Sequence, residues 1–131
     1  MILGLGVDLV DVAAFGELCR SQPFLIATFS DDERGYATAA GHAGRDVHLA
    51  ARYAAKEAAL KALDAASALV GVTPPAVPLG DIEVVRDARG RPALRWHGRA
   101  AELASALEVR RTHLSLTHDG RGAAAVVALE A

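Results

Sequence analysis

Lysine is almost absent from this chain of 131 residues. Lys56 and Lys61 are the only lysines, and every other long basic side chain is arginine. Cysteine is scarce too, because Cys19 stands alone, and this excludes an internal disulfide and argues against a cysteine-based zinc site. Aromatic residues make up only 5% of the sequence, so alanine and aliphatic side chains must build the core.

The chain also has little net charge. A formal charge of −2 lacks the basic excess typical of proteins that bind nucleic acids or anionic membranes. Hydrophobic residues make up 52% and charged residues 23%, as in folded globular proteins. The length suits a single domain, which we expect to span residues 1–131. Asp8 interrupts the apolar N-terminal run, so we expect no signal peptide, no membrane span and a cytoplasmic location.

The N-terminal segment alternates between apolar and small residues, which predicts a β-strand over residues 2–10. We expect its apolar face to be buried; that face holds Leu3, Leu5, Val7 and Leu9. The other face carries Gly4, Gly6 and Asp8. Two glycines in a strand let another backbone or a ligand come close. Asp8 therefore either ends the strand or marks a site.

The remaining pattern mixes helices and strands. We expect a short helix over residues 12–20 and another from Asp31, because Ser30 and Glu33 have capping-box spacing. Residues 35–46 favour a loop with a helical start. The longest helical pattern covers 47–66, prolines interrupt 69–80, and the further expected elements are strands at 81–86 and 93–97, a helix at 99–107 and strands at 112–117 and 123–129. This order predicts an α+β fold, with an antiparallel sheet packed on the long helix.

The long helix divides into faces when its residues are placed about 100° apart. A smooth face for close packing consists of Ala51, Ala55, Ala58, Ala59 and Ala62. A second stripe is spaced for the core and consists of Leu49, Tyr53, Leu60 and Leu63, with Lys56 in its middle. A third line carries Glu57, Lys61 and Asp64. A charged Lys56 in an apolar stripe must either extend to water or meet an anion.

Glu57 and Lys61 allow two interpretations. As neighbours at i and i+4 they would form a surface ion pair worth roughly 0.3–0.5 kcal/mol. Arginine would serve such a pair equally well, and this chain uses arginine everywhere else. Lysine instead carries a compact charge and can release its proton when its environment lowers its pKa. The set of Lys56, Glu57 and Lys61 therefore favours a functional role.

A second polar cluster follows the predicted strand at 112–117. His113, Ser115 and Thr117 share one face, and His118 comes at the strand end. Such a face is either the solvated side of a sheet or part of a site. His118 and Asp119 also match part of a metal-phosphohydrolase signature, but the upstream ligands that such a site needs are not evident.

Three separated stretches resemble one family. They are LGLGVDLV at 3–10, HLAARYAAKEAALKAL at 48–63 and LSLTHDGRGAAAVVAL at 114–129, supported by FSDDE at 29–33 and DARGRP at 87–92. Together they resemble the bacterial holo-acyl-carrier-protein synthases, the small type of 4′-phosphopantetheinyl transferase. The resemblance covers essentially the whole chain and implies the fold of that family.

The resemblance also implies a reaction. The 4′-phosphopantetheine arm of coenzyme A would pass to a serine of an apo acyl carrier protein, or of a carrier domain in a larger synthase, as a step of fatty acid biosynthesis. Adenosine 3′,5′-bisphosphate would be the other product. Asp8 and Glu57 match the family's carboxylates for Mg²⁺, a cation that prefers oxygen ligands. Glu57 would accept the serine proton, either directly or through a metal-bound water, and Lys61 would neutralise or protonate the leaving phosphate.

Further family positions imply contacts with coenzyme A. They are Arg52, Lys56, Lys61, Gly90, Arg91, Pro92, Ser115, Thr117 and His118. The resemblance further implies a homotrimer in which the helix of one subunit and the hairpin or last strand of its neighbour share one coenzyme A. One departure concerns the first helix, which is basic in several relatives but here has a single arginine, Arg20. The carrier must therefore dock through other arginines or through apolar contacts.

Two other classes of function remain open at this point. A metal-dependent phosphohydrolase would use the same carboxylates and His118 to activate water. A non-catalytic binding module would use the lysine helix to hold a nucleotide or a protein partner.

Overall fold

The computed structural model describes the whole backbone and all side chains except those of His42 and Ala43. Its strands are β1 (Ile2–Asp11), β2 (Ile82–Arg86), β3 (Pro92–Trp96), β4 (Arg111–His118) and β5 (Gly122–Glu130). Its helices are α1 (Val12–Leu18), α2 (Gln22–Thr28), α3 (Asp31–Ala39), α4 (Gly41–Leu69) and α5 (Gly98–Ala106), with a 3₁₀ turn, η1, at Leu79–Asp81.

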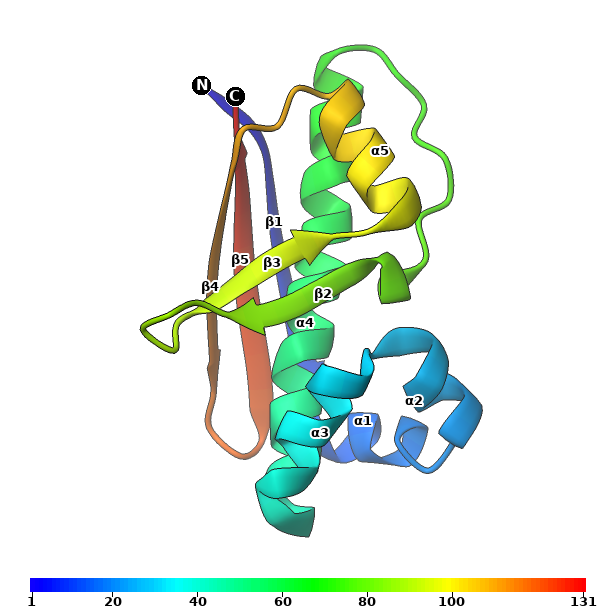
Figure 1. Cartoon of the computed structure of the whole chain (residues 1–131), viewed down its shortest axis with the longest axis vertical. Coiled ribbons are helices and arrows are strands. Elements are labelled where there is room, and N and C mark those ends of the chain that lie inside the picture. Colours follow the sequence, from blue (N-terminus) through cyan, green and yellow to red (C-terminus); the bar gives the residue numbers. More distant parts are fainter.

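The long helix α4 organises the molecule (Figure 1). The antiparallel sheet β1-β5-β4 lies along one side of α4, and the hairpin β2–β3 crosses another side. The short helices α1, α2 and α3 gather around one end of α4, and α5 covers the other end. The expected α+β fold with an antiparallel sheet on a long helix is therefore confirmed. No helix in the described part of the chain combines the length and the apolarity needed to cross a bilayer.

The contact between β1 and α4 is so close that only glycine fits on the strand. A Cβ atom added to Gly6 would lie 1.8 Å from the carbonyl oxygen of Ala58, and one added to Gly4 would lie 2.0 Å from that of Ala62. On the helix, the predicted alanine face is fully buried against the sheet. The glycine face of β1 is thus the packed face, as backbone-to-backbone contact demands.

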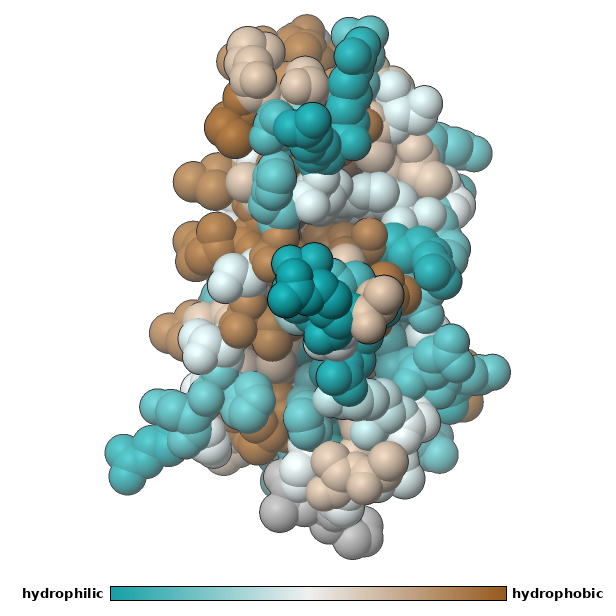
Figure 2. All heavy atoms as spheres, turned by 60° about the vertical axis from the view of Figure 1, so that its left-hand side comes forward, coloured by the Kyte–Doolittle hydropathy of each residue, from teal (hydrophilic) through white to brown (hydrophobic). Residues whose placement is uncertain are grey.

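The expectation that the leucine face of β1 is buried was wrong. Leu3 is buried, but Leu5, Val7 and Leu9 are 62%, 59% and 77% exposed. Because side chains alternate along a strand, packing the glycines onto α4 turns these residues away from it. Val126 on β5 is also exposed, and Figure 2 shows hydrophobic surface gathered along the sheet side of the molecule. We call Leu5, Val7, Leu9 and Val126 the open sheet face.

The segment between α3 and α4 also differs from the expectation. Residues 35–46 were expected to form a loop with a helical start. The helical start is present, because α3 continues to Ala39, but α4 already begins at Gly41 and replaces the expected loop. The capping box of Ser30 and Glu33 is present as predicted. The first helix ends at Leu18 instead of residue 20, and the sequence patterns did not indicate α2.

Replacing Gly6 with alanine should destabilise the fold. The added methyl group would collide with the α4 backbone, and such overpacking costs about 1–3 kcal/mol of the free energy of unfolding. Gly35→Ala is the matched control, because Gly35 lies in α3 with no neighbouring atom within 4 Å of the new Cβ, and helix propensity alone should make it stabilising. Urea unfolding of both variants tests this packing. Equal stability of Gly6→Ala and the parent would contradict it.

Candidate active site

Asp8, Glu57 and Lys61 come together where β1 crosses α4. The Lys61 ammonium donates to the Val7 carbonyl oxygen at 2.9 Å and to Asp8 Oδ1 at 3.1 Å. The Asp8 side chain is only 17% exposed, whereas that of Lys61 is 56% exposed. Lys61 therefore pairs with Asp8 across the glycine contact, and the alternative of a Glu57–Lys61 surface pair is not what the structure contains.

A cavity of about 320 Å³ opens beside these groups. We call it the carboxylate pocket; it is lined by Asp8, Leu9, Val10, Asp11, Ala14, Phe15, Leu18, Tyr53 and Glu57. Burial, together with the charge of Glu57, raises the pKa of Tyr53 above its ordinary value, which keeps this hydroxyl protonated. The pocket thus presents the carboxylates of Asp8, Asp11 and Glu57 and a neutral phenol against a largely apolar wall formed by α1.

The donor set of the carboxylate pocket fits Mg²⁺. Asp8 and Glu57 supply hard oxygen ligands from neighbouring elements. No cluster of three or more histidine, cysteine or acidic side chains with metal-site geometry exists among the described residues. Two carboxylates are enough for Mg²⁺, which usually retains waters and completes its shell with substrate phosphate oxygens.

A second cavity of about 180 Å³ lies between α4, the β2–β3 hairpin and the end of β4. We call it the arginine pocket; it is lined by Tyr36, His48, Arg52, Val84, Arg86, Gly90, Pro92, Leu116 and His118. The structure thereby unites four residues that the sequence predicted as contacts of coenzyme A: Arg52, Gly90, Pro92 and His118. It adds Tyr36, His48 and Arg86, which the sequence analysis missed.

The arginine pocket is electrostatically positive. The guanidinium groups of Arg52 and Arg86 lie 4.5 Å and 4.8 Å from the centre of the Tyr36 ring. The rings of His48 and His118 lie 5.8 Å apart. Burial lowers the pKa of His48, and the charges of Arg52, His118 and Arg86 lower it further. Two permanent cations, Arg52 from α4 and Arg86 from β2, and two histidine rings therefore converge on one small space.

Arg52 is a buried charged residue of the arginine pocket. The residue is only 7% exposed, and burial lowers its pKa. One guanidinium nitrogen donates to the His48 carbonyl oxygen at 3.4 Å, whereas Nε has no hydrogen-bond partner within the chain. A buried donor without an acceptor is costly, so the pocket is suited to an anion that supplies one.

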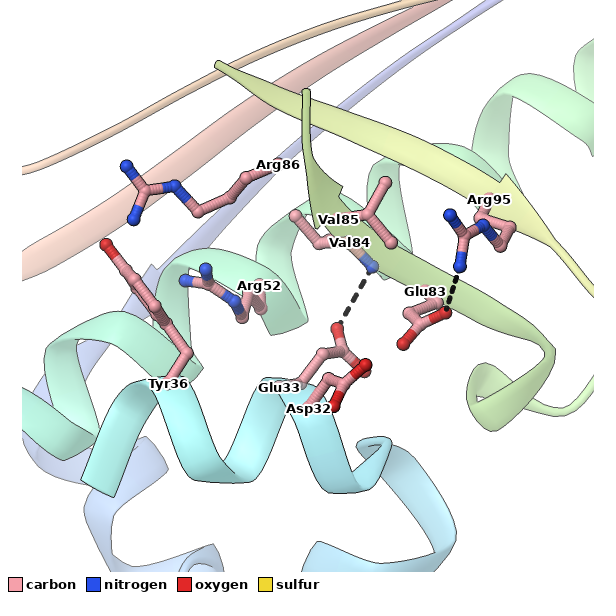
Figure 3. A pocket seen from close by; sticks show the side chains of 9 residues that line it. All are labelled: Asp32, Glu33, Tyr36, Arg52, Glu83, Val84, Val85, Arg86 and Arg95. Carbon is pink, nitrogen blue, oxygen red and sulfur yellow. Dashed lines mark hydrogen bonds and ion pairs between the residues drawn. The ribbon is translucent and has the colours of Figure 1, made fainter. Parts of the chain in front are cut away.

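A larger adjoining cavity of about 330 Å³ extends from the arginine pocket toward α3 (Figure 3). The two cavities share Tyr36, Arg52, Val84 and Arg86. In Figure 3, Tyr36 stands beside Arg52 and Arg86, whereas the carboxylates of Glu33 and Glu83 lie further along. The shared walls make the two cavities one continuous recess.

The other predicted site residues lie outside these pockets. Lys56 is fully buried, so its expected contact with coenzyme A has no support in this geometry. Arg91 does not line the arginine pocket, and its side chain pairs with Asp87 at 2.8 Å. Ser115 and Thr117 are exposed on the opposite face of β4 from Leu116, on the same side of the sheet as the open sheet face.

The two pockets lie on different sides of α4. Arg52 and Glu57 are five residues apart, which turns their side chains about 140° away from each other on a helix. The carboxylate pocket and the arginine pocket have no lining residue in common. A ligand bound in the arginine pocket of one chain is therefore separated from the Asp8–Glu57 pair of the same chain by the helix itself.

A carboxylate pair beside a lysine, together with a buried anion pocket on a small α+β domain, defines the class of site that acts on a phosphorylated substrate. The chain belongs to the 4′-phosphopantetheinyl transferase superfamily, whose family model matches residues 4–127.

Individual relatives agree with this family. The chain is 44% identical over 135 residues to the holo-[acyl-carrier-protein] synthase of Anaeromyxobacter dehalogenans (strain 2CP-C), covering 99% of this chain and 97% of that protein. Among solved structures, Mycobacterium tuberculosis acyl carrier protein synthase matches with a TM-score of 0.72 and 40% identity over 100% of this chain and 99% of that one. A Chronobacterium ammoniagenes ACPS–CoA complex matches with a TM-score of 0.75 and 37% identity over 97% and 96%.

The charge of the arginine pocket predicts an unusual histidine. His48 should titrate below 6.5, the ordinary value, because burial and the neighbouring cations disfavour its charged form. An anion in the pocket should raise this pKa by neutralising the cations. Histidine-selective NMR titration with and without inorganic pyrophosphate measures both effects. A His48 pKa at or above 6.5 in the free protein would show that the pocket is less positive than its geometry indicates.

Proposed function

We propose that this chain transfers the 4′-phosphopantetheine group of coenzyme A to a serine hydroxyl of an apo acyl carrier protein. The observation that carries the proposal is the pairing of Asp8 and Glu57 in one pocket with Lys61 beside them. Family membership and relatives that are holo-acyl-carrier-protein synthases, one of them in complex with coenzyme A, support it. The reaction would take place in the cytoplasm and serve fatty acid biosynthesis, with adenosine 3′,5′-bisphosphate as the second product.

Glu57, Lys61 and Asp8 have different roles in the proposed reaction. Glu57 accepts the proton of the serine hydroxyl, whose oxygen attacks the pantetheine-side phosphorus of the pyrophosphate. A new serine O–P bond forms as the bond to the bridging oxygen breaks and adenosine 3′,5′-bisphosphate leaves. Lys61 stabilises the negative charge that develops on this leaving phosphate. Asp8 and Glu57 would hold Mg²⁺, which when bound adds positive charge against the phosphate oxygens.

The arginine pocket would hold the nucleotide end of coenzyme A. Arg52 offers an unpartnered donor to a phosphate oxygen, Arg86 adds positive charge beside it, and the rings of His48 and His118 offer further hydrogen-bonding nitrogens. The Gly90 backbone turns with a positive φ of 79°, and together with Pro92 it borders the same space. The adenosine would lie against this turn. Nothing in this arrangement requires a contact from Arg91.

A homotrimer would bring the two half-sites together. Within one chain the nucleotide pocket and the reacting groups lie on different sides of α4, so one coenzyme A would bridge the arginine pocket of one subunit and the carboxylate pocket of its neighbour. The open sheet face provides apolar area for such an interface, since contiguous exposed apolar surface is typical of protein contacts. Ser115 and Thr117 would then face the neighbouring subunit.

The transfer reaction itself is directly measurable. With coenzyme A, Mg²⁺ and an apo carrier protein, the carrier should gain a mass of about 340 Da, as expected for a covalent phosphopantetheinyl product. Glu57→Gln and Lys61→Ala should each lower the rate at least about tenfold, because each removes a group that acts in the transition state. Intact-mass spectrometry follows the product.

Asp64→Asn is the control, because Asp64 lies one to two turns further along the same side of α4 and is exposed. Its rate should remain within about threefold of the parent, a difference of under 1 kcal/mol in barrier. Rates within that range for both Glu57→Gln and Lys61→Ala would contradict the assigned chemistry. Consumption of coenzyme A without a carrier would instead indicate a hydrolase.

If each active site is formed by two subunits, two variants that are inactive alone should complement each other. Arg52→Gln and Glu57→Gln should each be nearly inactive alone, whereas their co-expression should restore about a quarter of the parent activity, because random mixing places both intact residues at one site in four.

The proposed trimer also predicts the mass of the protein in solution. Sedimentation equilibrium should give a mass three times that of one chain for the parent. Leu5→Glu should reduce this mass, and Leu69→Glu, at an equally exposed leucine on α4, should not. Absence of complementation in stably mixed oligomers would show that each chain works alone.

A further inference from the structure

Lys56 belongs to a buried charge pair in the centre of the molecule. The side chains of Lys56 and Glu33 are 0% and 1% exposed, and the ammonium lies 2.9 Å from Glu33 Oε1. Lys56 also donates to the carbonyl oxygens of Ile82 and, at 3.5 Å, Leu79. Burial lowers the pKa of Lys56, and the neighbouring Glu33 carboxylate offsets part of this effect. All the acceptors around the ammonium therefore come from the chain itself.

Glu33 extends this pair into a network. Its Oε2 accepts the backbone N–H of Val84 at 3.1 Å, and its Oε1 accepts that of Ser30 at 2.9 Å. The Ser30 hydroxyl in turn donates to Glu83 Oε2 at 2.7 Å. The network thus ties α3, η1 and β2 to α4 by directional bonds around a buried ion pair.

Three of the elements held by this network, α3, β2 and α4, also supply walls of the arginine pocket. Tyr36 follows Glu33 by three residues on α3, Arg86 follows Val84 by two residues on β2, and Arg52 precedes Lys56 by one turn on α4. Glu33 itself borders the adjoining cavity in Figure 3. Lys56 and Glu33 thus connect the elements that form three walls of the pocket.

We propose that Lys56 is a positioning residue: its ammonium clamps α3 and the β2–β3 hairpin onto α4 and so fixes the shape of the pocket that binds the nucleotide end of coenzyme A. The inference rests on the proposed function for the identity of the ligand. Lys56 does not contact coenzyme A.

The geometry explains why this position is lysine in a chain rich in arginine. A compact ammonium has three donors that can point toward acceptors in different directions. Here the acceptors belong to Glu33, Leu79 and Ile82, which lie on three different structural elements, α3, η1 and β2. A planar guanidinium directs its donors within one plane and would need more space than the core provides. Removing only one partner of such a pair leaves a buried charge without compensation.

The reacting groups are held by a different contact. Asp8 and Glu57 are positioned by the packing of Gly4 and Gly6 against the α4 backbone, which does not involve Lys56. Loss of the clamp should therefore weaken the binding of coenzyme A more than it slows the chemical step. A raised KM with an almost unchanged kcat would therefore distinguish loss of the clamp from a uniform loss of stability.

Two variants test the clamp. Glu33→Gln keeps the shape and removes one charge, and the double variant Lys56→Met with Glu33→Gln removes both buried charges. Each should raise the KM for coenzyme A at least about tenfold while kcat stays within about threefold of the parent. Amide hydrogen exchange should become faster in residues 82–96 but not in β1 or β5. Asp31→Asn is the control, because it removes an exposed α3 carboxylate that pairs with Arg34.

The outcomes separate the alternatives. An unchanged KM for coenzyme A, with unchanged exchange in the hairpin, would overturn the proposal. A raised KM with unchanged hairpin exchange would also overturn it and would indicate direct contact between Lys56 and the ligand. A fall in kcat alone would place Lys56 in the chemistry instead. If the parent protein transfers nothing to a carrier, the proposed function fails, but hydrogen exchange and calorimetric binding of adenosine 3′,5′-bisphosphate still decide whether the clamp exists.

Discussion

The rest of this structure depends on one backbone contact, the packing of Gly4 and Gly6 of β1 against α4. Because no side chain separates the two backbones, Asp8 lies close enough to α4 to pair with Lys61 and to share a pocket with Glu57. The same contact fixes the orientation of the strand, so that alternate residues must point outward. The geometry that assembles the reacting groups therefore also creates the apolar open sheet face, so the proposed subunit interface and the site depend on the same constraint.

Local patterns in the sequence predicted the elements but not the orientation of β1. The alternation of residues 2–10, the capping box at Ser30 and the alanine face of α4 are periodic signals, and the corresponding elements are present. The burial of Leu5, Val7 and Leu9 was predicted from hydrophobicity alone. The rule that the more hydrophobic face of a strand is buried does not hold where two backbones pack closely, because the smallest residues must then face the contact. Residues 35–46 were misassigned because glycine lowers helix propensity, which the packing of α3 and α4 overcomes.

The candidate site was predictable to the extent that its residues are close in the sequence. Glu57 and Lys61 share one side of a helix, and His48 could have been found because it lies one turn before Arg52. Tyr36 and Arg86 come from other elements and carry no local signal, since only the folded chain brings them to Arg52. The sequence also could not show that the predicted site residues divide between two pockets on different sides of α4.

The two lysines differ from the arginines in what their charge must do. Arg52 and Arg86 lie over an aromatic ring at the border of a cavity, where a permanently charged planar group can stack and still bind an anion. Lys61 reaches from α4 over the glycine contact to Asp8 and to a backbone carbonyl, which suits a small charge on a long stem. Lys56 meets acceptors from several directions in the core. In both cases a point charge satisfies a geometry that a guanidinium would not, so the scarcity of lysine reflects the few positions that require it.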